Sequence, residues 1–215
     1  MNVTLASWIM QVLLMIHPPE KMERSWKETT SEITARYQLI ANDLSEVIEA
    51  ESSKTNPETS HLDNPIFEGD YGKFQTAALM LSIAYYESNF HKLVDNGKWK
   101  GDNGKSWCLM QVNLNNGNVY IGSPEMKKWT GNDLVNDHKK CFKAGLAIIK
   151  QSINDCSKKG FVGFDLLSEY TTGHCMKNEP YATRRWNMGE MLLNQIKVKN
   201  NNSTVNSFNN NKCNK

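Results

Sequence analysis

Glu87 is the residue of this 215-residue chain whose surroundings most favour chemistry. It follows TAALMLSIAYY, residues 76–86, a stretch that would be apolar on almost every side of a helix. Ala84, Ile83 and Met80 share its helical face, so its carboxyl group should lie at the edge of an apolar surface. Partial desolvation raises the pKa of such a carboxyl group, as a general acid working near neutral pH requires. The alternative is a glutamate that merely ends its helix in solvent.

Three short motifs follow one another in a specific order. They are ESNF at residues 87–90, GKSWCLMQVN at 104–113 and YTTG at 170–173. This ordered set resembles the lytic transglycosylase and goose-type lysozyme superfamily. In that superfamily a Glu-Ser pair ends a buried helix, and a Gly-Leu-Met-Gln-like turn and a Tyr-Asn-x-Gly-like motif come later. The resemblance covers about residues 72–196, and it departs from the pattern at Cys108, Thr171 and Thr172.

The resemblance implies a muramidase that cleaves the β-1,4 bond between N-acetylmuramic acid and N-acetylglucosamine. We expect no cofactor, and no structural metal site, because the sequence has no Cys-x-x-Cys or His/Cys cluster with zinc-ligand spacing. Glu87 would serve first as acid and then as base, and a 1,6-anhydro sugar would result. Ser106, Met110 and Gln111 would line the groove floor beneath the sugars. Tyr170 would orient the substrate's acetamido group or Glu87 itself.

A second carboxylate would favour hydrolysis over transglycosylation. Asp95 and Asp102 follow Glu87 in a glycine-rich segment, where goose-type enzymes place helper aspartates. Asp102 is therefore a candidate for positioning water. Both aspartates also begin Asp-Asn-Gly sequences, which are typical of turns, so the choice between the two reactions stays open.

The cysteines allow an argument from geometry. Cys141 and Cys156 lie 15 residues apart on one expected helix, or about 22 Å by helical rise, which is too far for a mutual disulfide. We expect two bridges that tie this helix to the motif segments, Cys108–Cys141 and Cys156–Cys175. Four free buried thiols are the alternative.

Hydrophobic periodicity predicts a mostly helical α+β domain with a buried central helix and a small turn and β segment after Glu87. The resemblance implies that this domain is lysozyme-like. The expected helices cover about residues 5–16, 21–51, 72–88, 132–154, 164–170 and 179–196, with a loop at 52–72 and turns or short strands at 92–123. We divide the chain into an N-terminal helical accessory segment packed on the body (1–70), a catalytic domain (71–198) and a disordered Asn-rich tail (199–215).

The net charge of +2 argues against a dedicated nucleic-acid binder, but it conceals an asymmetry. Residues 1–70 carry −7 and residues 71–215 carry +9, and a basic body favours an anionic partner such as peptidoglycan. The basic pairs Arg184-Arg185 and Lys127-Lys128 are expected on solvated faces; the alternative is a basic groove that meets the peptide carboxylates of peptidoglycan.

The segment at residues 5–16 is too short to span a bilayer and lacks the pattern of a signal peptide. Because two disulfides would need an oxidising compartment, we expect an extracytoplasmic or virion-associated protein, whose route out of the cell is open. We further expect a monomer, of phage or bacterial origin. The competing functions are a non-catalytic glycan-binding or virion-structural protein and, as another enzyme, a chitin-type hydrolase.

Overall fold

The computed structural model of the protein describes residues 3–52 and 65–195. Within them, helices dominate and one small antiparallel sheet is present, so the fold is α+β and mostly α, as predicted. No helix in these two ranges is long and apolar enough to cross a membrane. The predicted Asn-rich tail (199–215), with Cys213, and residues 53–64 of the predicted loop lie outside the described residues.

Within residues 3–52, three helices precede the central one. Helix α1 (Leu5–Ile16) begins where the Thr4 hydroxyl accepts a hydrogen bond from the Ser7 amide, and it buries an apolar stripe. The single helix expected at 21–51 is wrong, because the chain forms α2 (Pro19–Trp26) and α3 (Thr30–Ser52). Lys27 lies between them with a left-handed φ of 55°, which interrupts the helical hydrogen bonding.

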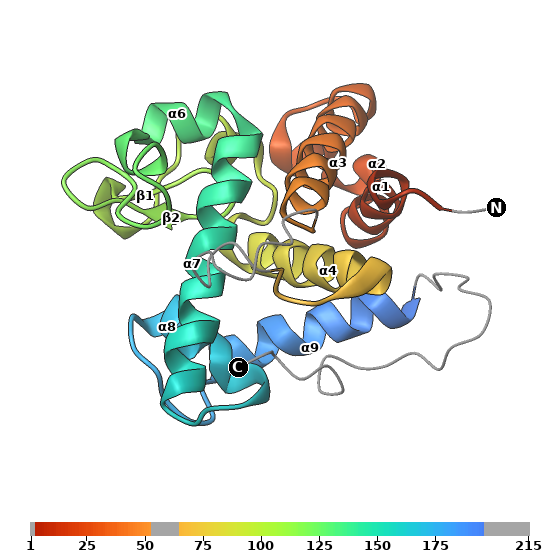
Figure 1. The fold of residues 1–215 in the computed structure, drawn as a ribbon. Coiled ribbons are helices and arrows are strands. Elements are labelled where there is room, and N and C mark those ends of the chain that lie inside the picture. Colours follow the sequence, from red (N-terminus) through yellow and green to blue (C-terminus); the bar gives the residue numbers. More distant parts are fainter. Residues whose placement is uncertain (1–2, 53–64, 196–215) are drawn as a thin grey trace.

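Helix α4 (Gly69–Ser88) is the predicted buried helix. Every residue from Gln75 to Ala84 is buried, and the helix ends at Asn89 in the left-handed conformation. Figure 1 shows α9 (Pro180–Gln195) lying beside α4. Helices α1 and α3 also pack against α4, on a different side from α9. Apolar side chains from all four helices belong to one core.

The segment after α4 is built from turns, as its glycine and asparagine content predicts. It contains α5 (Lys92–Asp95), a 3₁₀ turn (Asp102–Gly104), strands β1 (Ser106–Trp107) and β2 (Val112–Asn113), and a second 3₁₀ turn (Met126–Lys128). In the antiparallel pair, Ser106 is opposite Asn113 and Trp107 is opposite Val112.

The helix expected at 132–154 is also interrupted. It consists of α6 (Gly131–Asn136) and α7 (His138–Lys158), because the Asp137 carboxylate accepts hydrogen bonds from the Lys139 and Lys140 amides and starts a new helix. A 3₁₀ helix (Gly163–Leu167) then leads into α8 (Ser168–Thr172). In Figure 1 the β segment and α8 lie on the same side of α7, near its two ends.

Both predicted disulfides are present. Cys108–Cys141 joins the turn after β1 to the start of α7, and Cys156–Cys175 joins the end of α7 to the segment after α8. The Cα atoms of the two pairs are 6.1 Å and 5.3 Å apart. The rod-like α7 therefore holds one covalent link near each of its ends.

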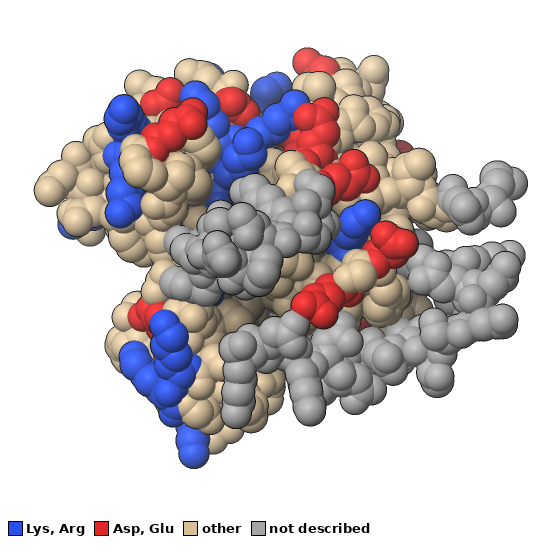
Figure 2. Space-filling view, in the orientation of Figure 1, with Lys and Arg blue, Asp and Glu red and all other residues tan. Residues whose placement is uncertain are grey.

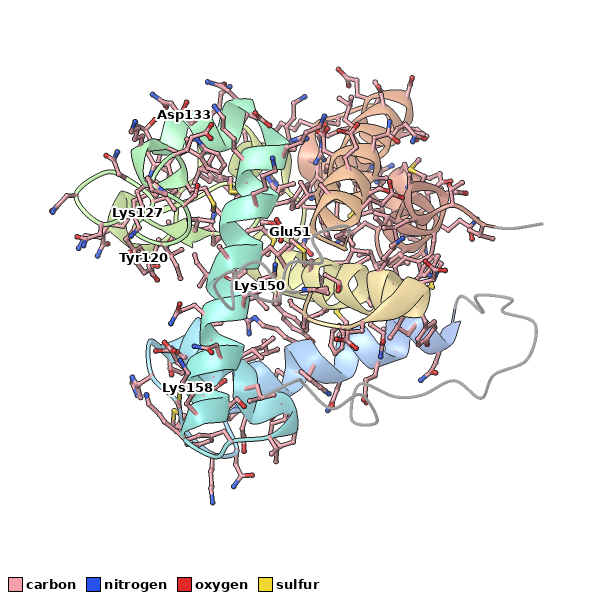
Figure 3. All side chains as sticks on the ribbon, in the orientation of Figure 1. Glu51, Tyr120, Lys127, Asp133, Lys150 and Lys158 are labelled. Atoms are coloured by element: carbon pink, nitrogen blue, oxygen red, sulfur yellow. A yellow bond between two sulfur atoms is a disulfide. The ribbon has the colours of Figure 1, made fainter. Side chains whose placement is uncertain are left out.

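Acidic side chains of α3 meet basic side chains of α7. Lys150 donates to Glu51 over 2.6 Å, and Figure 3 shows these two residues close together where the helices approach. Lys139 pairs with Glu46 and lies 3.8 Å from Asp43. Figure 2 likewise shows acidic atoms over α3 beside basic atoms over α7. Some acidic residues of the N-terminal segment therefore form ion pairs with basic residues of the body.

Candidate active site

A cleft of about 850 Å³ lies between the β segment and α8. Its lining combines Glu87 at the end of α4, Tyr120, Ile148 of α7, and Tyr181 and Arg185 of α9 with residues around the sheet and around α8. Those around the sheet are Gly101, Asp102, Lys105, Ser106, Gln111, Asn113, Leu114 and Asn115, and those of α8 and the residue after it are 169–173. Figure 2 shows the surface hollowed between these two parts, at the left of the view, and in Figure 3 Tyr120 lies at the edge of the upper part. Residues from all three sequence motifs therefore meet in one cleft.

Glu87 is partly buried in this cleft, with 21% of its side chain exposed. Its Oε1 accepts a hydrogen bond of 2.7 Å from Nη2 of Arg185. Burial raises the pKa of Glu87 above its ordinary value, and the charge of Asp102 adds to the increase, while Arg185 opposes it. The carboxyl group thus has the raised pKa that its position on an apolar helix predicts.

Asp102 lies in the same cleft and is held by two donors. The Ser106 hydroxyl donates to its Oδ2 over 2.5 Å, and the Asn113 amide donates to the same oxygen over 3.3 Å. Ser106 and Asn113 are opposite each other in the sheet, so the two-stranded ladder places both donors. Asp102 also lies in a turn, with a φ of 48°. It is therefore both a turn residue, as its Asp-Asn-Gly sequence predicts, and part of the cleft lining.

Gln111 lines the cleft and also stabilises its wall. Its Oε1 accepts from the Gly101 amide over 2.9 Å, and its Nε2 donates to the Cys108 carbonyl over 3.0 Å. A Cβ at position 101 would come within 2.4 Å of that Oε1, so glycine is needed for the close approach. Much of the side chain's hydrogen-bonding capacity is therefore used inside the protein.

Met110 and Tyr170 are coupled in a way that the sequence did not indicate. The Met110 side chain is fully buried, lies against Gly145 and is not part of the cleft lining. Its carbonyl oxygen accepts the Tyr170 hydroxyl over 2.9 Å. Burial, with the nearby charge of Glu87, raises the pKa of Tyr170 well above its ordinary value, so its phenol stays neutral.

Two functional candidates were missed by sequence reasoning. Arg185 was expected on a solvated face, and this is wrong, because the residue is only 8% exposed and faces Glu87. The available signal was its place beside Ala182 and Trp186 on the buried stripe of α9. Glu169 also lines the cleft, and its Oε2 is buried without a hydrogen-bond partner among the described residues. Burial raises the pKa of Glu169, and no motif pointed to this residue.

Asp95 lies outside the cleft lining. It is buried at the end of α5 and pairs with His138 over 2.8 Å and with Arg36 over 3.6 Å. This arrangement gives Asp95 a structural role in joining α3, α5 and α7.

One cluster among residues 3–52 and 65–195 has the spacing of a metal site, and it consists of Cys156, Glu169 and Cys175. The two sulfur atoms are joined in a disulfide, so they offer no thiolate to a metal ion. Nothing in this cluster therefore argues for a metal centre.

Comparisons of the chain with known protein families, with curated proteins and with solved structures find no match. What the cleft can do chemically follows from its side chains. It combines a partly desolvated carboxyl group, a second carboxylate held by two donors, and a neutral phenol. Such a set can donate a proton to a leaving oxygen and can place a hydroxyl group or a water molecule beside it.

Proposed function

We propose that the protein is a peptidoglycan-cleaving muramidase of lysozyme-like fold, in which Glu87 protonates the glycosidic oxygen between N-acetylmuramic acid and N-acetylglucosamine. The observation that carries the proposal is the partly buried Glu87 carboxyl group, with its raised pKa, at the meeting point of three motif segments in one cleft. The resemblance of those motifs to lytic transglycosylases and goose-type lysozymes supports the same assignment.

In the proposed reaction the proton on Glu87 passes to the leaving oxygen as the bond to the sugar's anomeric carbon breaks. Positive charge then develops on an oxocarbenium-like ring. The Glu87 carboxylate next accepts a proton from the attacking oxygen. In a transglycosylase that oxygen is the C6 hydroxyl of the same sugar, which gives the 1,6-anhydro product, and in a hydrolase it is water.

The position of Asp102 makes the hydrolase a specific second candidate. Its carboxylate lines the cleft with Glu87 and is close enough to raise the pKa of that residue. With two donors holding Oδ2, its other oxygen can accept a hydrogen bond from water. Asp102→Asn should therefore abolish a hydrolytic reaction but leave most of a transglycosylation that uses Glu87 alone.

The experiment is digestion of purified peptidoglycan sacculi by the wild type, by Glu87→Gln and by Glu20→Gln, an exposed glutamate of α2, as the matched control. We expect the wild type and Glu20→Gln to release soluble fragments at equal rates, and Glu87→Gln to lose about a hundredfold or more. Mass spectrometry then separates anhydro ends from reducing ends.

Equal digestion by the wild type and Glu87→Gln would remove Glu87 from the mechanism. Sacculus binding without digestion by any of the three proteins would favour the non-catalytic glycan-binding or virion-structural protein. Cleavage of chitin oligosaccharides at a rate equal to that of sacculi would favour the chitin-type hydrolase instead.

Two disulfides favour an oxidising location, so we place the proposed activity outside the cytoplasm or on a virion. Peptidoglycan is found in such a compartment, and its stem peptides carry the anionic groups that the basic body favours.

A further inference from the structure

Arg185 is the charged group in contact with the proposed acid. Its Nη2 donates to Oε1 of Glu87 over 2.7 Å, and its Nη1 donates to the Tyr181 carbonyl over 3.0 Å. Its guanidinium carbon lies 5.4 Å from the centre of the Tyr86 ring. With only 9% of its side chain exposed, this guanidinium is held by contacts with both α4 and α9.

The contact makes the two oxygens of Glu87 chemically different. Oε1 accepts from a guanidinium, which carries N–H donors and no acceptor and so can only donate to it. No hydrogen bond with another described side chain or backbone group engages Oε2, and Glu87 lines the cleft. A proton bound by Glu87 is therefore favoured on Oε2 rather than on Oε1.

The charge of Arg185 also affects how strongly Glu87 holds its proton. Three groups face this carboxyl group: Arg185 from α9, Asp102 from the 3₁₀ turn and Tyr170 from α8. Burial and Asp102 raise the pKa of Glu87, and Arg185 alone among them lowers it. Without Arg185 the acid would hold its proton more tightly, and the carboxylate left after proton transfer would lose the cation that donates to it.

We propose that Arg185 is the positioning residue of the acid: it anchors Oε1 of Glu87, so that Oε2 carries the proton to the substrate, and it stabilises the carboxylate that remains. This inference rests on the proposed function for its catalytic consequence, whereas the pairing itself can be measured without any substrate. It assigns a role to α9, to which none of the three motifs belongs.

The catalytic test compares the pH dependence of kcat for fragment release by the wild type, Arg185→Met, Arg185→Lys and Arg184→Met. Arg184 is the matched control, since it is the exposed neighbour and its guanidinium lies over the Tyr181 ring. In Arg185→Met we expect the alkaline limb, where Glu87 loses its proton, to move to higher pH. The maximal kcat should fall by about tenfold to a hundredfold. Arg185→Lys should restore the position of the limb and part of the rate.

A purely structural role for Arg185 would lower the melting temperature without moving the alkaline limb, and that result would overturn the proposal. The limb of Arg184→Met should coincide with that of the wild type. If Arg185→Met does not fold, Arg185→Gln keeps a polar side chain without the charge, and we expect the same displacement of the limb.

The second test needs no activity. The protein is labelled with ¹³C at glutamate carboxyl groups, the Glu87 resonance is assigned by its loss in Glu87→Gln, and its titration is followed by NMR. The midpoint should be higher in Arg185→Met than in the wild type and unchanged in Arg184→Met. An unmoved midpoint would refute the pairing, whereas a moved midpoint in a protein that cleaves no glycan would refute only the proposed function.

Discussion

His138 provides a direct test of how the protein is held together around the start of α7. Its Nε2 lies 2.8 Å from Oδ1 of Asp95, and its Nδ1 lies 3.3 Å from Oδ2 of Asp43. Only the imidazolium form can donate from both ring nitrogens. Burial alone would lower the pKa of His138, but the hydrogen bonds and charges of the two aspartates outweigh it and raise the pKa. The charged ring thus connects α3, α5 and α7.

The perturbation is His138→Gln, which removes the charge and keeps a polar side chain. The side chain of Asp95 is only 8% exposed, so its carboxylate would lose its closest cation and keep Arg36 at 3.6 Å. Breaking a buried ion pair by removing one partner costs 3–5 kcal/mol, and because Arg36 remains we expect about 3 kcal/mol at pH 5.5.

The pH dependence has a definite sign. A histidine whose folded pKa is raised contributes stability that is fully present below its unfolded pKa, about 6.5, and is lost as the pH rises through the folded pKa. The difference in free energy of unfolding between wild type and His138→Gln should therefore be largest in acid. It should shrink above about pH 6.5, by no more than about 1.4 kcal/mol per pH unit for one proton.

The measurement is urea unfolding with intact disulfides, followed by far-ultraviolet circular dichroism from pH 5.5 to 9. His174→Gln, at an exposed position, is the matched control. His17 and His91 have lowered pKa values and add a dependence of opposite sign, but both are present in every protein compared, so the difference isolates His138. A difference that is constant across this range would refute the charged bridge.

Two further predictions concern contacts behind the cleft, a disulfide of α7 and the packing of Gly131 on Trp107. The double variant Cys156→Ala/Cys175→Ala should lose about 3 kcal/mol of free energy of unfolding, measured by chemical unfolding. The reason is that the disulfide closes a loop between residues 19 apart and so lowers the conformational entropy of the unfolded chain. It should also lose fragment-releasing activity, since α8 is then free of its covalent link; unchanged stability and activity would show that the link is dispensable. Gly131→Ala would place a Cβ 2.1 Å from the Trp107 ring, so the ring must move. We expect Gly131→Ala to lose about 1–3 kcal/mol of free energy of unfolding and so to have a lower melting temperature, and its near-ultraviolet circular dichroism should change. A spectrum like that of the wild type would contradict the contact between Gly131 and Trp107.

The buried helix, and the absence of a Cys141–Cys156 bond, were predictable because each depends on a strong local constraint. A run that is apolar on all sides must be buried on all sides, and this predicts α4 with its end at Ser88. The rise of a helix excludes a bond between Cys141 and Cys156, and this exclusion needs no knowledge of how distant parts of the chain are arranged. The pairing of each with a motif segment was a hypothesis beside four free thiols, because it depends on where α7 packs.

The missed helix breaks had local signals that apolar periodicity concealed. Thr29 and Glu32 form reciprocal hydrogen bonds at the start of α3, which is the capping pattern of a threonine followed three residues later by a glutamate. Asp137 similarly caps α7. Hydrophobic spacing continued across both sites, so it predicted one helix in each case where the chain forms two.

Arg185 could not be assigned from the sequence, because its partner Glu87 is 98 residues away. A pair of adjacent arginines on a helix is usually solvated. Here Arg184 is exposed and Arg185 is buried, since α9 presents only one of the two to α4. The docking of α9 against α4 is a tertiary fact, and it converts an ordinary basic residue into a contact of the candidate acid.

The two covalent links on α7 have a consequence for how a polymer would enter the cleft. One link ties α7 to the turn after β1, the other ties it to the segment after α8, and they are separated by 15 residues of a single helix, about 22 Å. A rigid rod with both segments bonded to it leaves no hinge between them. The opening should therefore have the same width before and after a strand binds, so little binding free energy is used for closure.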